Sequence, residues 1–470
     1  MRGSAGRRGA GYIAYAGTLF TSAFVVSLAA CVTRRVPDPG PPMVILPPGG
    51  GAVPDTAKRV PVIPEVPGNP TPDAPADGTL DVRVALATSS QEAPLTATSG
   101  WRLFDANNGV LVRGRAGDTW TVQRRGAGLR AVARTGQATQ VSERSVTLRT
   151  EAVDQYVVFA GRRYRGAIRV VASDSGLVVV NVLGVEDYLR GVVPLEIGAT
   201  RGANEQAAVE AQAIAARSYT WVRLSAAQNS GSRNVNFDMA ATVSDQVYGG
   251  ADAERESTDR AVRATAGMVL KFGGRVVDAP YSSACGGESA APDEVWRVSA
   301  SSAYLRRVSD RIPGMADRYY CDIAPRFSWT KEFTSTELDV AARSYLRQYT
   351  EGLSVAPGHV RGLSVESRTP SGRVARAVFM TDRGAYAVRA NDIRYVLRTS
   401  GAEILNSTYF SVNTETGRDG SLVRVVLRGN GYGHGVGMCQ WGAIGRARAG
   451  QTARSILAAY YPGTTVGPAS

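Results

Sequence analysis

The change of hydrophobic period near residue 200 is the feature that most constrains the fold of this 470-residue chain. Residues 79–190 alternate or bunch branched and aromatic side chains between glycine-bearing turns, which predicts short antiparallel strands. Residues 204–223 are rich in alanine and contain neither glycine nor proline, which predicts a helix. Helix and strand signals then alternate toward the C-terminus. The sequence predicts an α+β fold, with an antiparallel β-rich N-terminal lobe (79–190) merged with a mixed helix and strand catalytic body (191–470) in one domain.

The first 31 residues are typical of an export signal. Arg2, Arg7 and Arg8 precede an apolar stretch that ends in small residues, which is the order of the regions in a signal peptide. The next residue is Cys31, and Leu-Ala-Ala-Cys resembles the bacterial lipobox, whose cysteine is lipidated and becomes the mature N-terminus. The alternative is an ordinary signal peptide with a chance cysteine. We therefore expect an exported lipoprotein, anchored to a membrane on its periplasmic or extracytoplasmic face.

A proline-rich segment separates this signal from the rest of the chain. Residues 32–78 hold 13 of the 23 prolines, and such a composition predicts a disordered, extended tether. The formal net charge of the chain is +13 at pH 7, and a basic protein favours anionic partners. Because an exported protein does not meet nucleic acid, the charge favours envelope polymers or lipid headgroups as partners.

Two glutamates precede the alanine-rich segment and differ in their surroundings. Glu196 lies between Leu195 and Ile197, and an apolar surround raises the pKa of a carboxyl, as a general acid working near neutral pH requires. Glu186 lies beside Asp187 in a more polar stretch, which is typical of a charge-paired structural residue. Glu196 is therefore the candidate acid, and the alternative is the capping or surface role of most glutamates near helix starts.

The stretch GNGYGHGVGMCQWGA (429–443) has glycine at every second position from 429 to 437. This spacing differs from that of phosphate-binding loops, and such a density of glycine lets the backbone approach a ligand or another strand closely. An indole offers an apolar face to a sugar ring, and a glutamine amide supplies a donor and an acceptor. We therefore expect His434, Gln440 and Trp441 to face this close approach. The alternative is a glycine-rich core turn around a satisfied histidine.

Several motifs occur in an order that resembles the stage II sporulation protein D family (SpoIID/LytB-like). The resemblance covers about residues 80–466 and is carried by NVLGVEDYLRGVVPLEIGA, AQAIAARSYT, YSSACGGESAAPDEVW, RYVLR, GHGVGMCQWGA and YYPGTTV. It implies the chemistry of a lytic transglycosylase, which cuts peptidoglycan glycan between MurNAc and GlcNAc and leaves a 1,6-anhydro end. Glu196 occupies the position of the family's catalytic acid. One glutamate suffices for such a reaction, whereas a glycoside hydrolase usually needs two carboxylates.

The resemblance also implies a set of substrate-binding residues, and it makes the glycine-rich stretch with His434, Gln440 and Trp441 a wall of a glycan cleft beside Glu196. The family's polar helix positions fall on Gln212, Arg217 and Tyr219, and Arg217 has the alternative of pairing with Glu186 or Asp187. In YSSACGGESA, the resemblance places Ser283 together with the tight turn of Gly286 and Gly287 on the same cleft.

The cysteines leave two readings open. If Cys31 is lipidated, Cys285, Cys321 and Cys439 remain, which is an odd number for an oxidising compartment. By the resemblance, Cys285 and Cys321 pair in a disulfide and Cys439 stays free, or the three cysteines and one other ligand hold a structural zinc ion. A histidine often stands in the family where this chain has Ser282, which weakens the case for a metal. The resemblance requires no cofactor for catalysis.

Two functions are consistent with the sequence. The first is a lipid-anchored lytic transglycosylase acting on glycan strands, preferably strands stripped of their stem peptides, beside a partner amidase. The second is a non-catalytic glycan-binding enhancer of an N-acetylmuramoyl-L-alanine amidase. The presence of Glu196 favours the enzyme.

Overall fold

The structure is a computed structural model that describes residues 81–469, apart from 230–235, 297–301, 351–355 and 400. The predicted signal peptide, Cys31 and the predicted tether lie outside the described residues. No helix among the described residues is both long enough and apolar enough to cross a membrane.

Residues 81–184 form strands, as their sequence predicts. These strands are β1 (Asp81–Ser90), β2 (Glu92–Ala97), β3 (Trp101–Phe104), β4 (Val110–Gly114), β5 (Trp120–Arg125), β6 (Gly128–Ala133), β7 (Ser145–Thr150), β8 (Val157–Phe159), β9 (Arg162–Tyr164), β10 (Ala167–Ser173) and β11 (Gly176–Gly184). One sheet has the order β12-β1-β11-β10-β7-β3-β4 and a second the order β6-β5-β2-β8-β9. All their pairings are antiparallel except that of β1 with β12.

The chain then changes to helices joined by short strands. These elements are α1 (Val185–Ile197), η2 (Ala203–Glu205), α2 (Gln206–Asn229), β12 (Met239–Ala240), η3 (Gly250–Ala253), α3 (Glu256–Ala264), β13 (Met268–Phe272), β14 (Arg275–Val276), β15 (Tyr281–Ser282) and α4 (Pro292–Val295). The predicted helix at 204–223 is confirmed. Helix α1 was not predicted, because Pro194 lies within its last turn and proline usually ends a helix.

A second group of elements follows Phe327 and forms one continuous segment of the chain. It comprises β16 (Ser328–Thr334), α5 (Ser335–Ala341), η4 (Ala342–Leu346), α6 (Arg347–Tyr349), β17 (Val360–Arg368), β18 (Val374–Thr381), β19 (Gly384–Arg389), α7 (Asp392–Val396), β20 (Phe410–Thr416) and β21 (Leu422–Asn430). Its sheets have the orders β16-β21-β20 and β17-β18-β19. We call residues 328–430 the inserted lobe.

The last elements return to the first group. They are β22 (Met438–Cys439), α8 (Gln440–Arg448), α9 (Ala453–Tyr460) and β23 (Thr465–Pro468). Strand β22 pairs in parallel with β15, and β23 completes the sheet β14-β13-β23. Together the helices and strands constitute an α+β fold.

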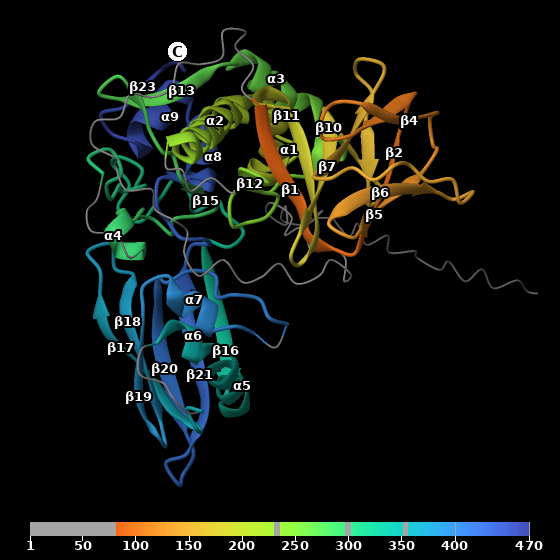
Figure 1. The fold of residues 1–470 in the computed structure, drawn as a ribbon. Helices are drawn as coiled ribbons and strands as arrows, with labels where there is room; N and C mark the ends of the chain where they lie inside the picture. The colour runs from red at the N-terminus through yellow and green to blue at the C-terminus, as the bar shows by residue number, and fades with distance from the viewer. Residues whose placement is uncertain (1–80, 230–235, 297–301, 351–355, 400, 470) are drawn as a thin grey trace, which may run out of the picture. The chain divides into compact units, whose positions relative to one another are not determined.

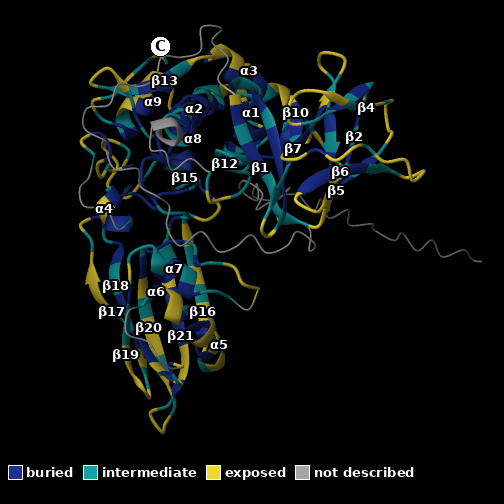
Figure 2. Cartoon of the chain, viewed as in Figure 1, coloured by how far each residue is buried: buried dark blue, intermediate teal, exposed yellow. Residues whose placement is uncertain are grey.

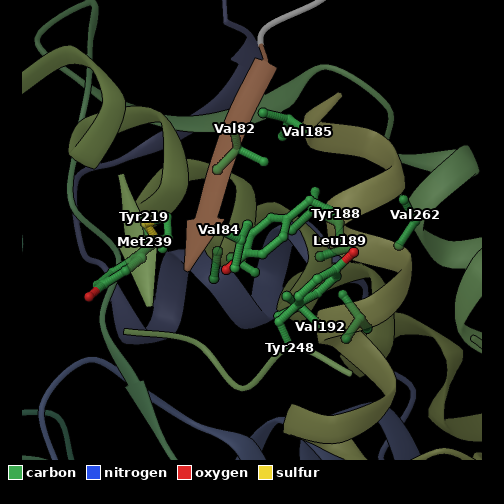
Figure 3. Close-up of a cluster of buried hydrophobic side chains, with 14 of the residues drawn as sticks. Val82, Val84, Val185, Tyr188, Leu189, Val192, Tyr219, Met239, Tyr248 and Val262 are labelled. Carbon is green, nitrogen blue, oxygen red and sulfur yellow. The ribbon is translucent and has the colours of Figure 1, made fainter. Parts of the chain in front are cut away.

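Helix α2 is central to the first group and contacts α1, α3, α8, α9 and β13 (Figure 1). Its residues 211–220 are all buried (Figure 2), and its many alanines allow these neighbours to approach closely. Tyr188 of α1 lies against Tyr248, with ring centroids 5.1 Å apart, and Val84 of β1 packs in the same cluster (Figure 3). This packing fixes α1, and therefore Glu196 in its last turn, against the β-rich region.

Two hydrophobic clusters form the core of the described residues. The first draws on residues both before and after the inserted lobe, from Val82 to Tyr461. The second is built from the continuous segment Phe333 to Leu427 alone. The inserted lobe therefore has a core of its own, which periodicity did not reveal because its strands and helices resemble those on either side.

Candidate functional site

Glu196 lies in the last turn of α1, two residues after Pro194. Its Oε1 atom accepts a hydrogen bond of 2.9 Å from the backbone N–H of Val247, and the side-chain amide of Gln440 is a second donor to the carboxyl. Gln440 begins α8, and its Nε2 atom also donates to Oε1 of Gln212 in α2 over 3.3 Å. We call Glu196, Val247, Gln440 and Gln212 the Glu196 site. Four separate segments therefore position one carboxyl.

Burial raises the pKa of the Glu196 carboxyl to about 7, while the donors Val247 and Gln440 lower it. The desolvation of the charged form outweighs both hydrogen bonds, because no positive charge acts on this carboxyl among the described residues. The rise in pKa that the apolar neighbours predicted is confirmed. Near neutral pH the group is divided between its acid and base forms, which suits proton transfer in both directions.

A layer of polar side chains lies behind the Glu196 site. Gln246 donates from Nε2 to the hydroxyl of Tyr281 (3.0 Å) and accepts at Oε1 from the hydroxyls of Tyr188 (3.1 Å) and Thr220 (3.0 Å). Burial raises the pKa of both Tyr188 and Tyr281 well above the ordinary value, and the charge on Glu196 adds to this rise. These hydroxyls therefore stay protonated and act only as hydrogen-bonding groups. They also hold Gln246, whose neighbour Val247 donates to Glu196.

Gln212 contributes an unsatisfied donor. Its side chain is fully buried, and its Nε2 atom has no hydrogen-bond partner among the described residues. An unpaired buried amide costs free energy, and functional sites are common places for such groups. The structure places Gln212 beside Gln440, and its role in substrate binding stays a prediction.

Arg217 lies elsewhere on α2. It forms a two-pronged ion pair with Glu186 (2.7 and 2.8 Å) and donates to the carbonyl of Met268 (3.0 Å). The pairing with Glu186, which the sequence left open as the alternative, is therefore present, and Glu186 is charge-paired as expected. Because these partners occupy the guanidinium, Arg217 fastens α1 to α2 and β13 and presents no free donor to Glu196.

Tyr219 is buried beside a charged pair rather than at Glu196. Its hydroxyl donates to Asp245 over 3.3 Å, and the guanidinium of Arg223 lies 4.6 Å from its ring centroid. Burial raises the pKa of Tyr219 above the ordinary value. Tyr219 adjoins the polar layer through Thr220, which follows it in the sequence, and through Asp245, which precedes Gln246.

His434 lies in the glycine-rich stretch with its ring 5.1 Å from that of Trp296. Its Nδ1 accepts from the backbone N–H of Val436 over 3.1 Å. Burial lowers the pKa of His434 to about 3, and the positive charges of Arg394 and Arg373 lower it further. The imidazole is therefore neutral at physiological pH and cannot act as a general acid there.

Trp441 is only 6% exposed, and the guanidinium of Arg201 lies over its ring at 5.0 Å. One ring face is therefore occupied by a cation, so Trp441 does not offer an open stacking surface to a sugar. Its backbone N–H donates to the carbonyl of Ser283 (3.0 Å), which brings these two predicted residues together.

The alternating glycines lie against another segment of the protein. Gly435 and Gly437 have positive φ angles (81° and 72°), and a Cβ atom at either would overlap Arg373 or the carbonyl of Pro280 respectively. Gly437 therefore allows the close backbone approach that was predicted, whereas Gly435 leaves room for the side chain of Arg373. The backbone partner of the glycine-rich stretch includes residues 280–284. Gly286 and Gly287 form a buried positive-φ turn (81° and 110°) against Asn430 and Tyr319. The latter two glycines support the loop around Cys285 rather than the surface at Glu196.

A second group of buried polar residues includes Cys439, which directly precedes Gln440 of the Glu196 site in the sequence. Cys285, Asp310, Cys321 and Cys439 are all buried, and their candidate ligand atoms lie within 4.8 Å of one another. We call these four residues the thiol cluster. All three cysteines are free thiols in the structure, so the predicted disulfide between Cys285 and Cys321 is not formed in it.

Sequence reasoning missed several groups. The backbone donor of Val247 has no side-chain signature, and Gln246 stands in a loop whose fold the sequence does not reveal. Asp310 was missed because only its position beside three cysteines distinguishes it from other aspartates. A cavity of about 540 Å³, which Trp329, Tyr409 and Arg428 help to line, lies on the inserted lobe and includes no residue of the Glu196 site.

Comparison with known proteins places this geometry in context. A family model described as "Stage II sporulation protein" matches residues 173–272, and a domain of unknown function matches residues 315–437. The chain is 32% identical over 310 residues to a Bacillus subtilis protein named "Amidase enhancer". The match covers 59% of this chain and 40% of that protein. It is 30% identical over 306 residues to "Stage II sporulation protein D" of the same organism, a match covering 62% of this chain and 76% of that protein. An uncharacterized protein of Brachyspira hyodysenteriae is 28% identical over 306 residues, covering 65% of this chain and 73% of that protein.

Proposed function

Because the chain belongs to the stage II sporulation protein D family, we propose that it binds peptidoglycan glycan strands and cleaves them as a lytic transglycosylase. Glu196 is the single acid and base of this reaction, and the product ends in 1,6-anhydroMurNAc. The proposal depends mainly on one observation, that the pKa of Glu196 is raised to about 7 while hydrogen bonds hold the carboxyl in place.

The chemistry follows from the two forms of this carboxyl. The protonated Glu196 gives its proton to the bridging oxygen between MurNAc and GlcNAc as the bond from that oxygen to C1 of MurNAc breaks. The resulting carboxylate then accepts the proton of the C6 hydroxyl of the same sugar, as the oxygen of that hydroxyl bonds to C1. No water is consumed, and Glu196 ends the cycle protonated.

The surroundings of Glu196 suit one carboxyl with both roles. No second carboxylate is among the groups that shift its pKa in the described part of the chain. A hydrolase normally places two carboxyl groups around the scissile bond. Val247 and Gln440 orient the charged form after the first proton transfer, and burial keeps the acid form populated before it.

A second candidate function is a non-catalytic one, in which the protein binds glycan and enhances an N-acetylmuramoyl-L-alanine amidase. The observation that favours it is the match to the protein named "Amidase enhancer". In this role Glu196 would contribute to glycan binding and would transfer no proton to the glycan, so no cleavage product would form.

The cellular setting belongs to the same proposal. The chain is exported and anchored through lipidated Cys31, and the tether of residues 32–78 lets the folded part reach glycan strands away from the membrane. The favoured substrates are denuded strands, prepared by a partner amidase. Catalysis requires no cofactor.

The decisive experiment compares the full chain with Glu196→Gln and Glu210→Gln on intact and amidase-treated sacculi. Glu210 is a matched control, because burial also raises the pKa of this glutamate but it lies on α2 outside the Glu196 site. We expect mass spectrometry to find anhydro-ended products with the wild type and Glu210→Gln, and a loss on the order of 100-fold to 10,000-fold with Glu196→Gln. The absence of anhydro products from both substrates, together with stimulation of an added amidase, would establish the second candidate instead.

A further inference from the structure

The inserted lobe has a cavity of its own, formed by residues of β16 and β21, the start of β20 and the end of β17 (Figure 1). Its volume of about 540 Å³ lies within the range of about 300–1,000 Å³ that is usual for ligand sites. The aromatic and charged side chains that line it are Trp329, Arg368, Tyr409, Phe410 and Arg428. We call this cavity the lobe groove. The family model that matches this region, residues 315–437, is described as a domain of unknown function, so it assigns the groove no ligand.

The lobe groove combines aromatic rings with exposed hydroxyl groups. Gly429 of β21 pairs in register with Trp329 of β16 on one side and with Phe410 of β20 on the other. The two rings lie 6.2 Å apart, and a Cβ atom at Gly429 would overlap the indole. Thr330 and Ser411, the residues that follow these aromatics in their strands, are exposed. Aromatic rings offer an apolar surface to a sugar ring, and hydroxyl groups both donate and accept hydrogen bonds.

The charge of the lobe groove is positive, because two arginines and no acidic residue line it. Arg428 is exposed, and its guanidinium has no hydrogen bond or ion pair within the part of the chain that the structure describes. Arg424, four residues earlier on the same strand, differs in this respect. It pairs with Glu415 (2.6 Å) and Glu332 (3.1 Å). Arg428 is therefore available to an anionic ligand, and a guanidinium suits a carboxylate well because it can donate two parallel hydrogen bonds to it.

Arg368 lies on the other side of β20 from Arg428. Successive carbonyl groups of a strand point to opposite sides. The carbonyl of Tyr409 accepts from the backbone N–H of Asn430 in β21 (2.9 Å), so the next carbonyl, that of Phe410, points away from β21. There it accepts from Nη2 of Arg368 (2.8 Å), whose Nη1 donates to a second backbone carbonyl (2.8 Å). A guanidinium has five N–H groups, so these two bonds fix Arg368 beside the groove and leave further donors for a ligand.

A denuded glycan strand carries an anionic group of the kind that such a groove would bind. An N-acetylmuramoyl-L-alanine amidase uses one water molecule to hydrolyse the amide between the lactyl group of MurNAc and the first residue of the stem peptide. The peptide leaves with a free amino group, and the lactyl group keeps a free carboxylate. In an intact strand the same carboxyl is a neutral amide. The lactyl carboxylate therefore distinguishes strands that an amidase has processed from those that it has not.

We propose that the lobe groove binds a MurNAc residue of a denuded strand, with Arg428 and Arg368 pairing with its lactyl carboxylate and the aromatic rings packing against the sugar. The groove thereby selects strands from which the stem peptides have been removed. Because every such MurNAc carries the carboxylate, the groove can bind a sugar other than the one that Glu196 cleaves. This inference rests on the proposed function, since it takes peptidoglycan glycan as the substrate.

The test measures binding of denuded glycan oligomers and of the same oligomers with their carboxylates converted to methylamides. Every protein is the full chain with Glu196→Gln, which prevents cleavage during the measurement. We expect the parent to bind the free-acid oligomers about tenfold more tightly than the methylamides. Arg428→Gln should abolish this preference, and Arg428→Lys, which keeps the charge, should retain part of it. Arg424→Gln is the control, because it removes the same charge from a paired position on the same strand, and its preference should equal that of the parent.

Equal preferences in Arg428→Gln and Arg424→Gln would overturn the proposal, because the effect would then come from the overall charge of the protein. Arg428-dependent binding of polyphosphate that the free-acid oligomers do not displace would overturn it too, by assigning the groove to phosphate polymers.

The outcome is separable from that of the proposed function, whose readout is the formation of anhydro-ended products by the chain with Glu196 intact. Cleavage together with an unchanged preference in Arg428→Gln would refute this inference alone. An Arg428-dependent preference without any cleavage would refute the transglycosylase and leave the groove as a glycan-binding site.

Discussion

Cys439 and Gln440 are consecutive residues, yet their side chains belong to two buried polar sites that differ in whether a cation pairs with the carboxyl. Cys439 faces the thiol cluster, whose carboxyl, Asp310, is paired with Arg446. Gln440 faces Glu196, whose carboxyl has hydrogen-bond donors but no cation. Burial raises the pKa of both carboxyls to about 7, and it does so at Asp310 although the charge of Arg446 and the hydroxyl of Tyr460 lower that pKa.

The difference indicates what each site is built for. A buried carboxylate with a cation and a hydroxyl donor stabilises the fold as long as its partners remain. A buried carboxyl without a cation destabilises the fold once it ionises, and this cost is the origin of its raised pKa. Arg446 and Tyr460 therefore offset part of the cost of ionising Asp310, whereas at Glu196 only hydrogen-bond donors do so and no cation among the described residues stabilises the charged form.

The largest expected effect comes from breaking the balance at Asp310. Burial raises the pKa of Asp310 to about 7, so its carboxylate form dominates at pH 8. Arg446→Met leaves this buried carboxylate without its cation, and we expect the free energy of unfolding to fall by about 3–5 kcal/mol, measured by urea denaturation at pH 8. Arg424→Met is the matched control, because Arg424 pairs with Glu415 on the exposed surface of the inserted lobe, and its unfolding curve should coincide with that of the wild type. Equal curves for the two variants would contradict the assigned role of Arg446.

Removing the charge at Glu196 should have the opposite sign. The folded pKa of about 7 lies above the ordinary value of 4.5, so the folded state binds more protons than the unfolded state between these values. The stability of the wild type therefore falls as the pH rises from 4.5 through 7. Glu196→Gln removes this penalty, and we expect it to be more stable than the wild type by up to about 3 kcal/mol at pH 8.

This advantage should disappear near pH 4, where Glu196 is protonated in both states. Thermal unfolding of both proteins from pH 4 to pH 8 measures the difference. If the difference in stability between Glu196→Gln and the wild type were the same at pH 8 as at pH 4, the carboxyl would not be desolvated.

Gln440→Leu should sharpen the comparison by removing a donor from Glu196. Because the amide of Gln440 lowers the pKa of Glu196, its loss should raise that pKa by up to about one unit. The alkaline limb of the pH dependence of kcat/KM for glycan cleavage should move upward with it. Gln451→Leu is the control, since Gln451 bonds the hydroxyl of Tyr320 instead, and its pH profile should be unchanged. A downward shift for Gln440→Leu would show that Gln440 does not donate to the carboxyl.

The smallest effect is expected in the polar layer behind Glu196. Tyr281→Phe removes one of the two acceptors of Nε2 of Gln246, the other being the carbonyl of Ala216, and we expect a loss of about 1 kcal/mol in the free energy of unfolding. Thr369→Val is the control: Thr369 is a partly buried threonine of the inserted lobe whose hydroxyl hydrogen-bonds with that of Ser371, and its loss should leave the pH profile of cleavage unchanged. A loss well above that of Arg446→Met would reverse the proposed ranking of the two sites.

The sequence alone predicted a good part of the Glu196 site. Leu195 and Ile197 indicated a raised pKa for Glu196, because residues adjacent in the sequence stay close to it in any fold. The alanine-rich stretch predicted α2 for the same reason, since helix propensity is a local property. The alternating glycines indicated close backbone approach, although not to which partner.

Other features depended on residues that meet only in three dimensions. The Val247 donor lies 51 positions from Glu196, and Asp310 gains its meaning only beside Cys285, Cys321 and Cys439. Arg217 could be assigned to Glu186 only once α1 and α2 were packed together.

The sequence by itself therefore determined the α+β class and the central helix, since these follow from local period and composition, and it indicated Glu196 as the candidate acid through its apolar neighbours and the family resemblance. The tertiary structure alone decided which donors hold Glu196, which acid joins the three thiols, and that a separate core divides the chain between Cys321 and Cys439. The physical reason is that hydrogen bonds, ion pairs and ligand sets depend on distances between atoms, and separation along the sequence does not fix those distances.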